Sequence, residues 1–72
     1  MKVVVNGIKR EIKENLSLSN LLEMLDLPGA RIAVELNQTV VRRAAWPETI
    51  LQENDKIEIV HFVGGGSSNS GF

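Results

Sequence analysis

Apolar and polar residues alternate in short runs along this chain of 72 residues, and turn residues separate the runs. Residues 3–5 and 8–12 are rich in Val and Ile, which favour strands because a branched Cβ packs well on a pleated surface. Asn6-Gly7 lies between the two runs and is typical of a two-residue hairpin turn, in which both central residues need a positive φ. The N-terminal residues therefore predict a β-hairpin.

A two-residue turn also predicts the register of this hairpin. It sets Val5 opposite Ile8 and Val3 opposite Arg10, and alternation then places Ile12 on the same face. We expect the Val and Ile side chains of this face to contact the core. The aliphatic part of Arg10 would cover the edge of the core, with its charged end in solvent.

A short helix is predicted over residues 16–25. Leucines at positions 18, 21, 22 and 25 have the spacing of one helical face, which we expect to be buried. Ser17 is the predicted N-cap, because its hydroxyl can accept a hydrogen bond from the backbone N–H of Asn20. Pro28-Gly29 is expected to end the helix.

Three more strand-like runs follow, over residues 32–36, 39–41 and 56–63. The connection over residues 42–49 has no clear period, and Trp46-Pro47 predicts extended backbone there because Pro restricts the residue before it. The large ring of Trp46 is expected to cover the small core, and a binding platform is the alternative.

The predicted order of elements is strand, strand, helix, strand, short strand, strand. A hairpin followed by a helix and returning strands gives a mixed sheet, in which the first strand is parallel to the last. We therefore predict an α+β fold of the ubiquitin-like β-grasp type, with roughly four or five strands and one helix packed across one face. Residues 1–63 would form this domain, and residues 64–72 a flexible Gly/Ser-rich C-terminal tail.

The last predicted strand divides its side chains between two faces. If its isoleucines contact the helix, Val60 and Phe62 point outward. Together with Val4 on a neighbouring strand and Val63 beside the tail, they would form an exposed apolar patch, which often marks a protein-binding surface. Scattered exposed apolar residues are the alternative interpretation.

Composition and charge exclude several classes of function. The formal net charge of −1 argues against nucleic acid as the main partner, since neutralising phosphates needs a basic surplus. No apolar run approaches the length of about 20 residues that a membrane span needs, and the run before Asn6 is too short for a signal peptide. The absence of Cys excludes disulfides and thiolate metal sites, and it fits a cytoplasmic protein. His61 is the single histidine, and we expect it at a surface position of a strand rather than in a metal site or catalytic set.

Five segments of the chain, taken together in their order, are specific for one protein family. They are Asn6-Gly7, the helix of residues 17–25, Val40-Val41-x-Arg43-x-x-Trp46, Asp55-x-Ile57-Glu58-Ile59-Val60 and Phe62-Val63-Gly64-Gly65-Gly66. Over residues 1–66 the chain resembles the ThiS family, the sulfur carriers of bacterial thiamine biosynthesis. It is less similar to the small subunit of molybdopterin synthase, which shares the fold and a Gly-Gly end. Arg42 and Asn54 depart from the Pro and Gly that the ThiS family often has at these turn positions.

The resemblance implies that the chain is a protein co-substrate rather than an enzyme. An adenylating, E1-like partner would use ATP and Mg²⁺ to activate the carboxylate of Gly66. Sulfur supplied from cysteine through a cysteine desulfurase would then form a thiocarboxylate, which thiazole synthase would consume. The resemblance implies no catalytic residue, no metal site and no stably bound cofactor in the carrier itself.

The glycines before this carboxylate matter for access to the partner. Gly64 and Gly65 have no side chain, so the tail can enter a narrow channel in the partner enzyme. Residues 67–72 follow Gly66, and three explanations stay open. A peptidase trims these residues, they are an addition to the natural sequence, or this chain has lost the sulfur-carrier activity. A molybdopterin-type carrier, a lysine-linked modifier and a ubiquitin-like binding module without sulfur chemistry are the alternative functions.

Overall fold

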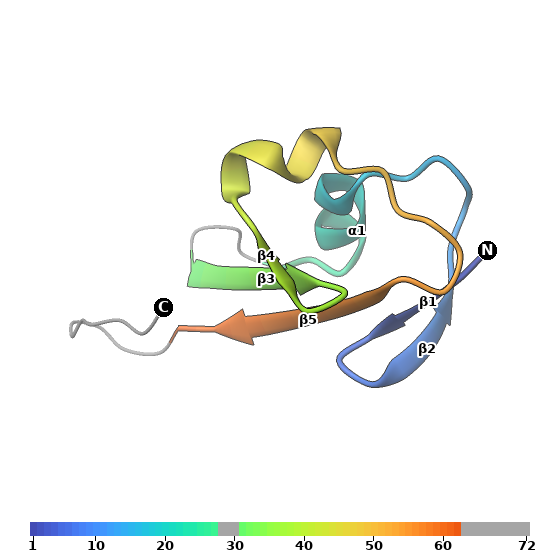
Figure 1. The fold of residues 1–72 in the computed structure, drawn as a ribbon, viewed down its shortest axis with the longest axis horizontal. Helices are drawn as coiled ribbons and strands as arrows, with labels where there is room; N and C mark the ends of the chain where they lie inside the picture. Colours follow the sequence, from blue (N-terminus) through green and yellow to red (C-terminus); the bar gives the residue numbers. More distant parts are fainter. Residues whose placement is uncertain (28–30, 63–72) are drawn as a thin grey trace.

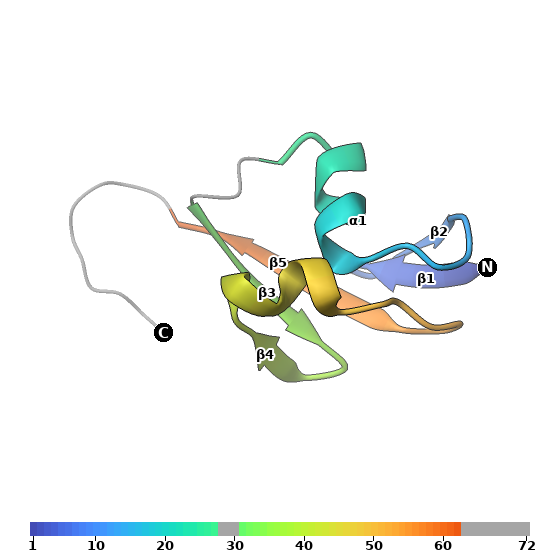
Figure 2. The same ribbon diagram turned by 90° about the horizontal axis from the view of Figure 1, so that it is seen from above.

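The computed structural model describes residues 1–27 and 31–62. In chain order the elements are β1 (Lys2–Val5), β2 (Ile8–Glu11), α1 (Leu18–Met24), β3 (Ile32–Leu36), β4 (Thr39–Val41), the 3-10 helix η2 (Arg43–Glu48) and β5 (Lys56–His61). Both helices lie over the same face of the sheet, which leaves the opposite face without a covering layer in the described part of the chain (Figures 1 and 2).

The strands form one five-stranded sheet in the order β2-β1-β5-β3-β4. β1 pairs with β5 in parallel, and the β1–β2, β3–β4 and β3–β5 pairs are antiparallel. This mixed sheet with α1 across one face is the ubiquitin-like β-grasp fold, as the order of elements predicts. The helix η2 is an additional element that the sequence pattern does not reveal.

Two tight turns build the outer parts of the sheet. Asn6 and Gly7 have φ values of 49° and 83°, so the predicted hairpin turn between β1 and β2 is confirmed. Asn37 and Gln38, with φ values of 52° and 73°, make a second turn with two positive φ values between β3 and β4. Asn is among the residues that tolerate a positive φ, which explains why it begins both turns.

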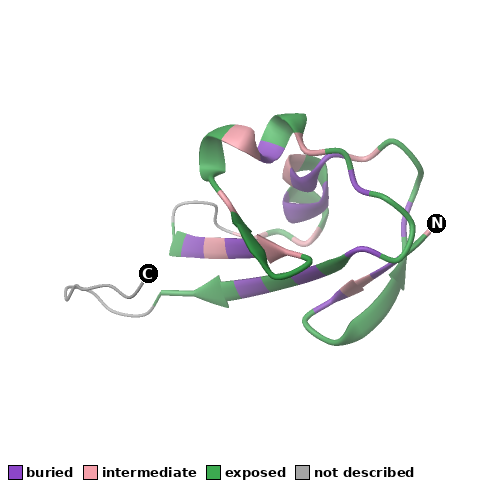
Figure 3. Cartoon of the chain, in the orientation of Figure 1, coloured by how far each residue is buried: buried purple, intermediate pink, exposed green. Residues whose placement is uncertain are grey.

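The predicted register of the first hairpin is confirmed, but the predicted burial of Ile8 is wrong. Val5 is opposite Ile8 and Val3 is opposite Arg10, whereas the side chain of Ile8 is 60% exposed. β2 is an edge strand and all of its residues are exposed (Figure 3). Only Ile12, just beyond β2, returns to the core.

Local signals set the position of α1. The hydroxyl of Ser17 accepts a hydrogen bond from Asn20 N–H at 3.0 Å, and the side-chain oxygen of Asn20 accepts one from Ser17 N–H at 3.2 Å. This reciprocal pair satisfies two backbone N–H groups and confirms Ser17 as the N-cap. The helix ends at Met24, and Pro28-Gly29 lies outside the described residues. No helix in residues 1–27 and 31–62 is long and apolar enough to cross a membrane.

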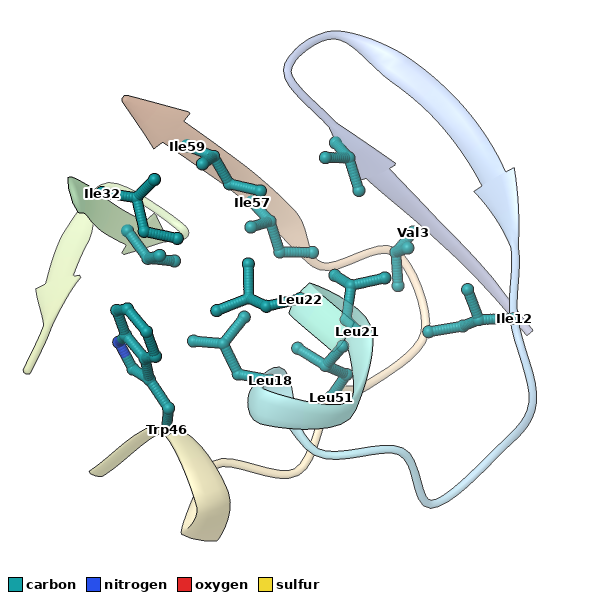
Figure 4. Close-up of a cluster of buried hydrophobic side chains, with 12 residues drawn as sticks. Val3, Ile12, Leu18, Leu21, Leu22, Ile32, Trp46, Leu51, Ile57 and Ile59 are labelled. Carbon is teal, nitrogen blue, oxygen red and sulfur yellow. The ribbon is translucent and has the colours of Figure 1, made fainter. Parts of the chain in front are cut away.

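The core lies between the two helices and the sheet. The leucines of α1 face the isoleucines of β5, as Figure 4 shows. The buried hydrophobic set is Val3, Val5, Ile12, Leu18, Leu21, Leu22, Ile32, Val34, Trp46, Leu51, Ile57 and Ile59. Leu18, Leu21 and Leu22 of the predicted stripe are thus confirmed as core, whereas Leu25 is only partly buried against it.

The connection around Trp46 differs from the sequence prediction. Trp46 and Pro47 lie inside η2, so the predicted extended backbone is wrong. Trp46 is only 6% exposed, and its Nε1–H donates to the carbonyl of Val41 at 2.9 Å. Burial of the ring together with this hydrogen bond outweighs the local preference that Pro47 imposes on its predecessor. Of the two predicted roles, covering the core is the one confirmed.

Candidate functional site

The strand that leads to the glycine run occupies the centre of the sheet. β5 lies between β1 and β3, and its side chains alternate between the two faces. Ile57 and Ile59 are buried at 0% and 7% exposure, whereas Val60 and Phe62 are 45% and 44% exposed. The predicted division of this strand is therefore confirmed: the isoleucines contact the helix side, and Val60 and Phe62 face outward.

The pairing of β5 with β3 continues to the last described residue. Val60 is opposite Ala33, and the backbone N–H of Phe62 donates to the carbonyl of Arg31 at 2.8 Å. His61 is opposite Ile32 and exposed, at the surface strand position predicted for it. The sheet therefore sets the direction of the chain as far as Phe62. Four predicted site residues, Val63, Gly64, Gly65 and Gly66, lie outside the described residues.

The uncovered face of the sheet, called here the outer face, carries the exposed side chains of Lys56, Glu58 and Val60 from β5. Val4 shares this face, but it is half-buried and lies opposite Lys56 on one side and Lys9 on the other. Lys56 is four residues before Val60, which corresponds to about 13 Å along a strand. The structure therefore brings Val60 and Phe62 to one end of the outer face and does not place Val4 beside them.

Three residues of the outer face were not among the site residues predicted from the sequence. Val40 is 55% exposed and lies opposite Glu35, which in turn lies opposite Glu58. The described residues give neither carboxylate a hydrogen-bond or ion-pair partner. Like charges directly opposite in a sheet repel each other, so the outer face holds an unfavourable pair next to apolar side chains. Alternation alone predicts that each Glu points outward, but only the β3–β5 register places them together.

A second feature lies on the helix side of the sheet. An open hollow of about 280 Å³ between α1 and η2 is lined by Ser19, Leu22, Glu23, Leu27, Arg43, Trp46 and Pro47. The guanidinium carbon of Arg43 lies 4.9 Å from the centre of the Trp46 ring, which is a cation–π distance. Within the described residues no group of three or more His, Cys, Asp or Glu is placed to hold a metal ion.

Comparisons with known proteins agree with this geometry. The sequence profile of the ThiS family matches residues 3–66. A thiazole synthase of Magnetococcus marinus is 41% identical over 66 residues, which cover 92% of this chain and 20% of that protein. The sulfur carrier protein ThiS of Escherichia coli K12 is 30% identical over 66 residues, which cover 92% of this chain and 100% of that protein. The crystal structure of the thiamine biosynthesis protein ThiS from Geobacter metallireducens superimposes with a TM-score of 0.81 at 33% identity, covering 92% of this chain and 100% of that one.

The matches differ in how much of each related protein the chain covers. The chain spans about a fifth of the thiazole synthases from Magnetococcus marinus and Paramagnetospirillum magneticum, 20% and 22% of their lengths. The family profile, in contrast, runs from β1 through the whole described fold to Gly66. Because the profile covers most of the sequence and a similar fold accompanies it, the chain belongs to the ThiS family.

Proposed function

We propose that this chain carries sulfur for thiazole formation in thiamine biosynthesis. It acts as a protein co-substrate rather than an enzyme, and its working group is the carboxylate of Gly66. The observation that carries the proposal is that the family match ends at Gly66, five residues beyond His61, where the central strand β5 ends. A sheet whose central strand leads into a glycine run suits a carrier whose own main chain is the reacting group.

The proposed chemistry activates a carboxylate, which is a poor electrophile. On an adenylating enzyme, an oxygen of the Gly66 carboxylate attacks the α-phosphate of ATP, and pyrophosphate leaves. The outer sulfur of a persulfide, formed from cysteine by a cysteine desulfurase, then attacks the carbonyl carbon and displaces AMP. A second thiol cleaves the S–S bond of the resulting acyl disulfide by disulfide exchange and supplies the two electrons, which leaves the sulfur on Gly66. The resulting thiocarboxylate passes its sulfur to the thiazole ring on thiazole synthase. ATP and Mg²⁺ are substrates of the partner in this scheme, and the carrier keeps no cofactor of its own.

The outer face supports docking to these partners. Val60 and Phe62 are exposed beside the start of the tail, and Val63 follows them in sequence. The carboxylates of Glu35 and Glu58 add negative charge to the same face. A complementary partner surface therefore offers apolar side chains together with a Lys or Arg. In this arrangement Val4 would contribute at the far end of the face rather than beside the tail.

The tail can reach an active site while the domain stays docked. The four residues from Phe62 to Gly66 span at most roughly 13 Å when extended. Gly64 and Gly65 have no side chains, so a narrow channel can admit them. Residues 67–72 must be absent or removed before Gly66 has a free carboxylate.

Thiazole synthase is favoured over molybdopterin synthase as the final partner by one observation. Two thiazole synthases contain a region that is 41% and 34% identical to this chain. In those proteins a carrier-like region and a thiazole synthase belong to the same polypeptide. We expect this carrier to act in the cytoplasm, which its lack of cysteine also fits. Copurification with thiazole synthase, rather than with the large subunit of molybdopterin synthase, would distinguish the two pathways.

The proposal is tested by the intact mass of the protein recovered from its own cells, grown with and without thiamine. We expect a species that ends at Gly66, and a second one in which sulfur replaces one oxygen. Recovery of only a chain that continues beyond Gly66, even under thiamine starvation, would contradict a role as sulfur carrier. It would favour a ubiquitin-like binding module instead.

A further inference from the structure

The two turn asparagines hydrogen-bond with their side chains at opposite ends of β5. Asn6 Oδ1 accepts from the backbone N–H of Ile59 at 2.6 Å, and Asn6 Nδ2 donates to the carbonyl of the same residue at 3.1 Å. Asn37 Oδ1 accepts from the N–H of Lys56 at 2.9 Å, and its Nδ2 donates to Asp55 Oδ1 at 3.0 Å. Asn37 thus holds the start of the strand, and Asn6 holds it three residues before Phe62.

The Asn6 side chain continues the parallel β1–β5 ladder after β1 has ended. Within the ladder, Val4 N–H donates to Asp55 O at 2.9 Å and Asn6 N–H donates to Ile57 O at 2.8 Å. The next two bonds of a regular parallel ladder would involve the N–H and the carbonyl of Ile59. The chain turns away at Asn6, where φ is 49°, and the side-chain amide makes both bonds in place of the missing backbone.

Few residue types can do this at position 6. The positive φ favours Asn, Asp or Gly over other residues. Of these three, only Asn offers an acceptor and a donor on one side chain, which Ile59 needs for its N–H and its carbonyl. Asn6 therefore meets the demands of the turn and of the ladder together.

The consequence concerns the end of the strand that leads to the tail. Beyond Ile59, β5 is paired with β3 on its other edge, through Val60 opposite Ala33 and through Phe62 N–H to Arg31 O at 2.8 Å. Within residues 1–27 and 31–62, the first hairpin makes several hydrogen bonds to β5. The Asn6–Ile59 pair is the one that lies nearest to Phe62. Without it, the exposed end of the strand would be held from one edge only.

We propose that Asn6 is a positioning residue for sulfur transfer, an inference that rests on the proposed function. Its amide holds the end of β5 in the orientation in which Val60 and Phe62 dock on the partner enzyme. In this orientation the strand points the tail, which contains Gly66, toward the partner's active site. A strand end that is already ordered loses less conformational freedom on docking, so it binds the adenylating partner more tightly.

The test compares Asn6→Gly with Asn37→Gly. Both variants remove an asparagine amide bonded at β5 from a turn residue of positive φ, 49° and 52°, where Gly is tolerated. Asn6→Gly removes hydrogen bonds at Ile59, near the end of β5, whereas Asn37→Gly removes one at Lys56, where β5 begins. We expect similar losses in denaturation midpoint, whereas hydrogen exchange of the Phe62 amide in the full chain rises only in Asn6→Gly. Because Phe62 N–H is bonded to Arg31, this readout is not a bond that the substitution itself removes.

The functional arm uses the chain ending at Gly66, after its exchange pattern over residues 1–62 has been matched to that of the full chain. With the adenylating enzyme of the same organism, we expect Asn6→Gly to raise the KM for the carrier about tenfold with kcat nearly unchanged. Asn37→Gly is expected to leave both constants close to those of the parent chain. Should Asn6→Gly fail to fold, Asn6→Asp, which keeps the acceptor and loses the donor, takes its place.

Three outcomes would overturn the inference, and they distinguish a wrong positioning role from a wrong function. If the parent chain is adenylated but both glycine variants raise KM equally, or if Phe62 exchange in Asn6→Gly stays at the parent rate, the positioning role is wrong and the proposed function stands. If the parent chain ending at Gly66 is not adenylated at all, the proposed function itself is wrong, and the role of Asn6 in it falls too.

Discussion

At the scale of single residues, side-chain polar atoms form hydrogen bonds with main-chain groups that would otherwise have no partner in this small domain. Trp46 donates its Nε1–H to the Val41 carbonyl at 2.9 Å while its ring is buried, so one residue closes the core and completes a hydrogen bond. In the described residues no buried side-chain nitrogen or oxygen lacks a hydrogen-bond partner. Such complete pairing matters in a chain of 72 residues, because a small core leaves a slim margin of stability.

Trp46→Phe tests this at one position. The substitution removes the donor to Val41 O and part of a buried ring, so we expect the free energy of unfolding to fall by about 1–3 kcal/mol. Urea denaturation followed by circular dichroism is the measurement, because the variant loses the single Trp fluorophore. Arg43→Gln is the control, since it removes an exposed cation–π contact worth about 0.5–1 kcal/mol. A smaller loss in Trp46→Phe than in Arg43→Gln would contradict the structural role of the tryptophan.

At the scale of elements, the antiparallel β3–β5 pair joins stability to recognition. Its inner side contributes Ile32, Val34, Ile57 and Ile59 to the core. Its outer side sets Glu35 directly opposite Glu58. The same register therefore stabilises the sheet through one face and costs stability on the other. On a face proposed for docking, the repulsion between Glu35 and Glu58 would be relieved when the partner places a positive charge beside them.

Glu35→Gln should make the domain more stable and the carrier less effective. Relief of the repulsion with Glu58 is expected to raise the free energy of unfolding by about 0.2–1 kcal/mol. The loss of charge should lower the association rate with the adenylating enzyme and weaken its dependence on salt. Denaturation curves and stopped-flow association at two ionic strengths measure the two effects.

The matched control is Glu14→Gln, which removes an exposed carboxylate in the loop between β2 and α1. It changes the net charge equally but leaves the β3–β5 pair intact. If Glu14→Gln slowed association as much as Glu35→Gln, total charge rather than the outer face would govern docking.

At the scale of the whole molecule, the two sides of the sheet have separate tasks. The helices and the core occupy one side (Figure 1). Val40, Val60 and Phe62 are exposed on the other side or at its end. The described fold is complete by Phe62, before the glycines begin. A substitution in the tail should therefore change function without changing the stability of the domain.

Gly65→Val is the corresponding prediction. A branched side chain should block entry of the tail into a narrow channel, so adenylation of the chain ending at Gly66 is expected to be abolished while the unfolding midpoint stays the same. Gly65→Ala, with a single added methyl group, should retain part of the activity. Pyrophosphate release with the adenylating enzyme measures both variants. Normal adenylation of Gly65→Val would rule out the threading of the tail.

The sequence alone was sufficient wherever the determining interactions are local. The Asn6-Gly7 turn depends on the φ values of adjacent residues, and the Ser17 cap acts over three residues, so both predictions are confirmed. The alternation along β5 also predicts its buried and exposed sides, because side chains of a strand alternate regardless of its neighbours. The order of these elements was enough to predict the β-grasp fold.

The tertiary structure decided what depends on distant parts of the chain. Ile8 is exposed because its strand lies at the edge of the sheet, and Trp46 lies in a helix because a distant core accepts its ring. The opposition of Glu35 and Glu58, and the double hydrogen bond from Asn6 to Ile59, exist only once separate strands have aligned. A local pattern can state which side of its own strand a residue occupies, but the residue that meets it there is set by packing and register across the whole sheet.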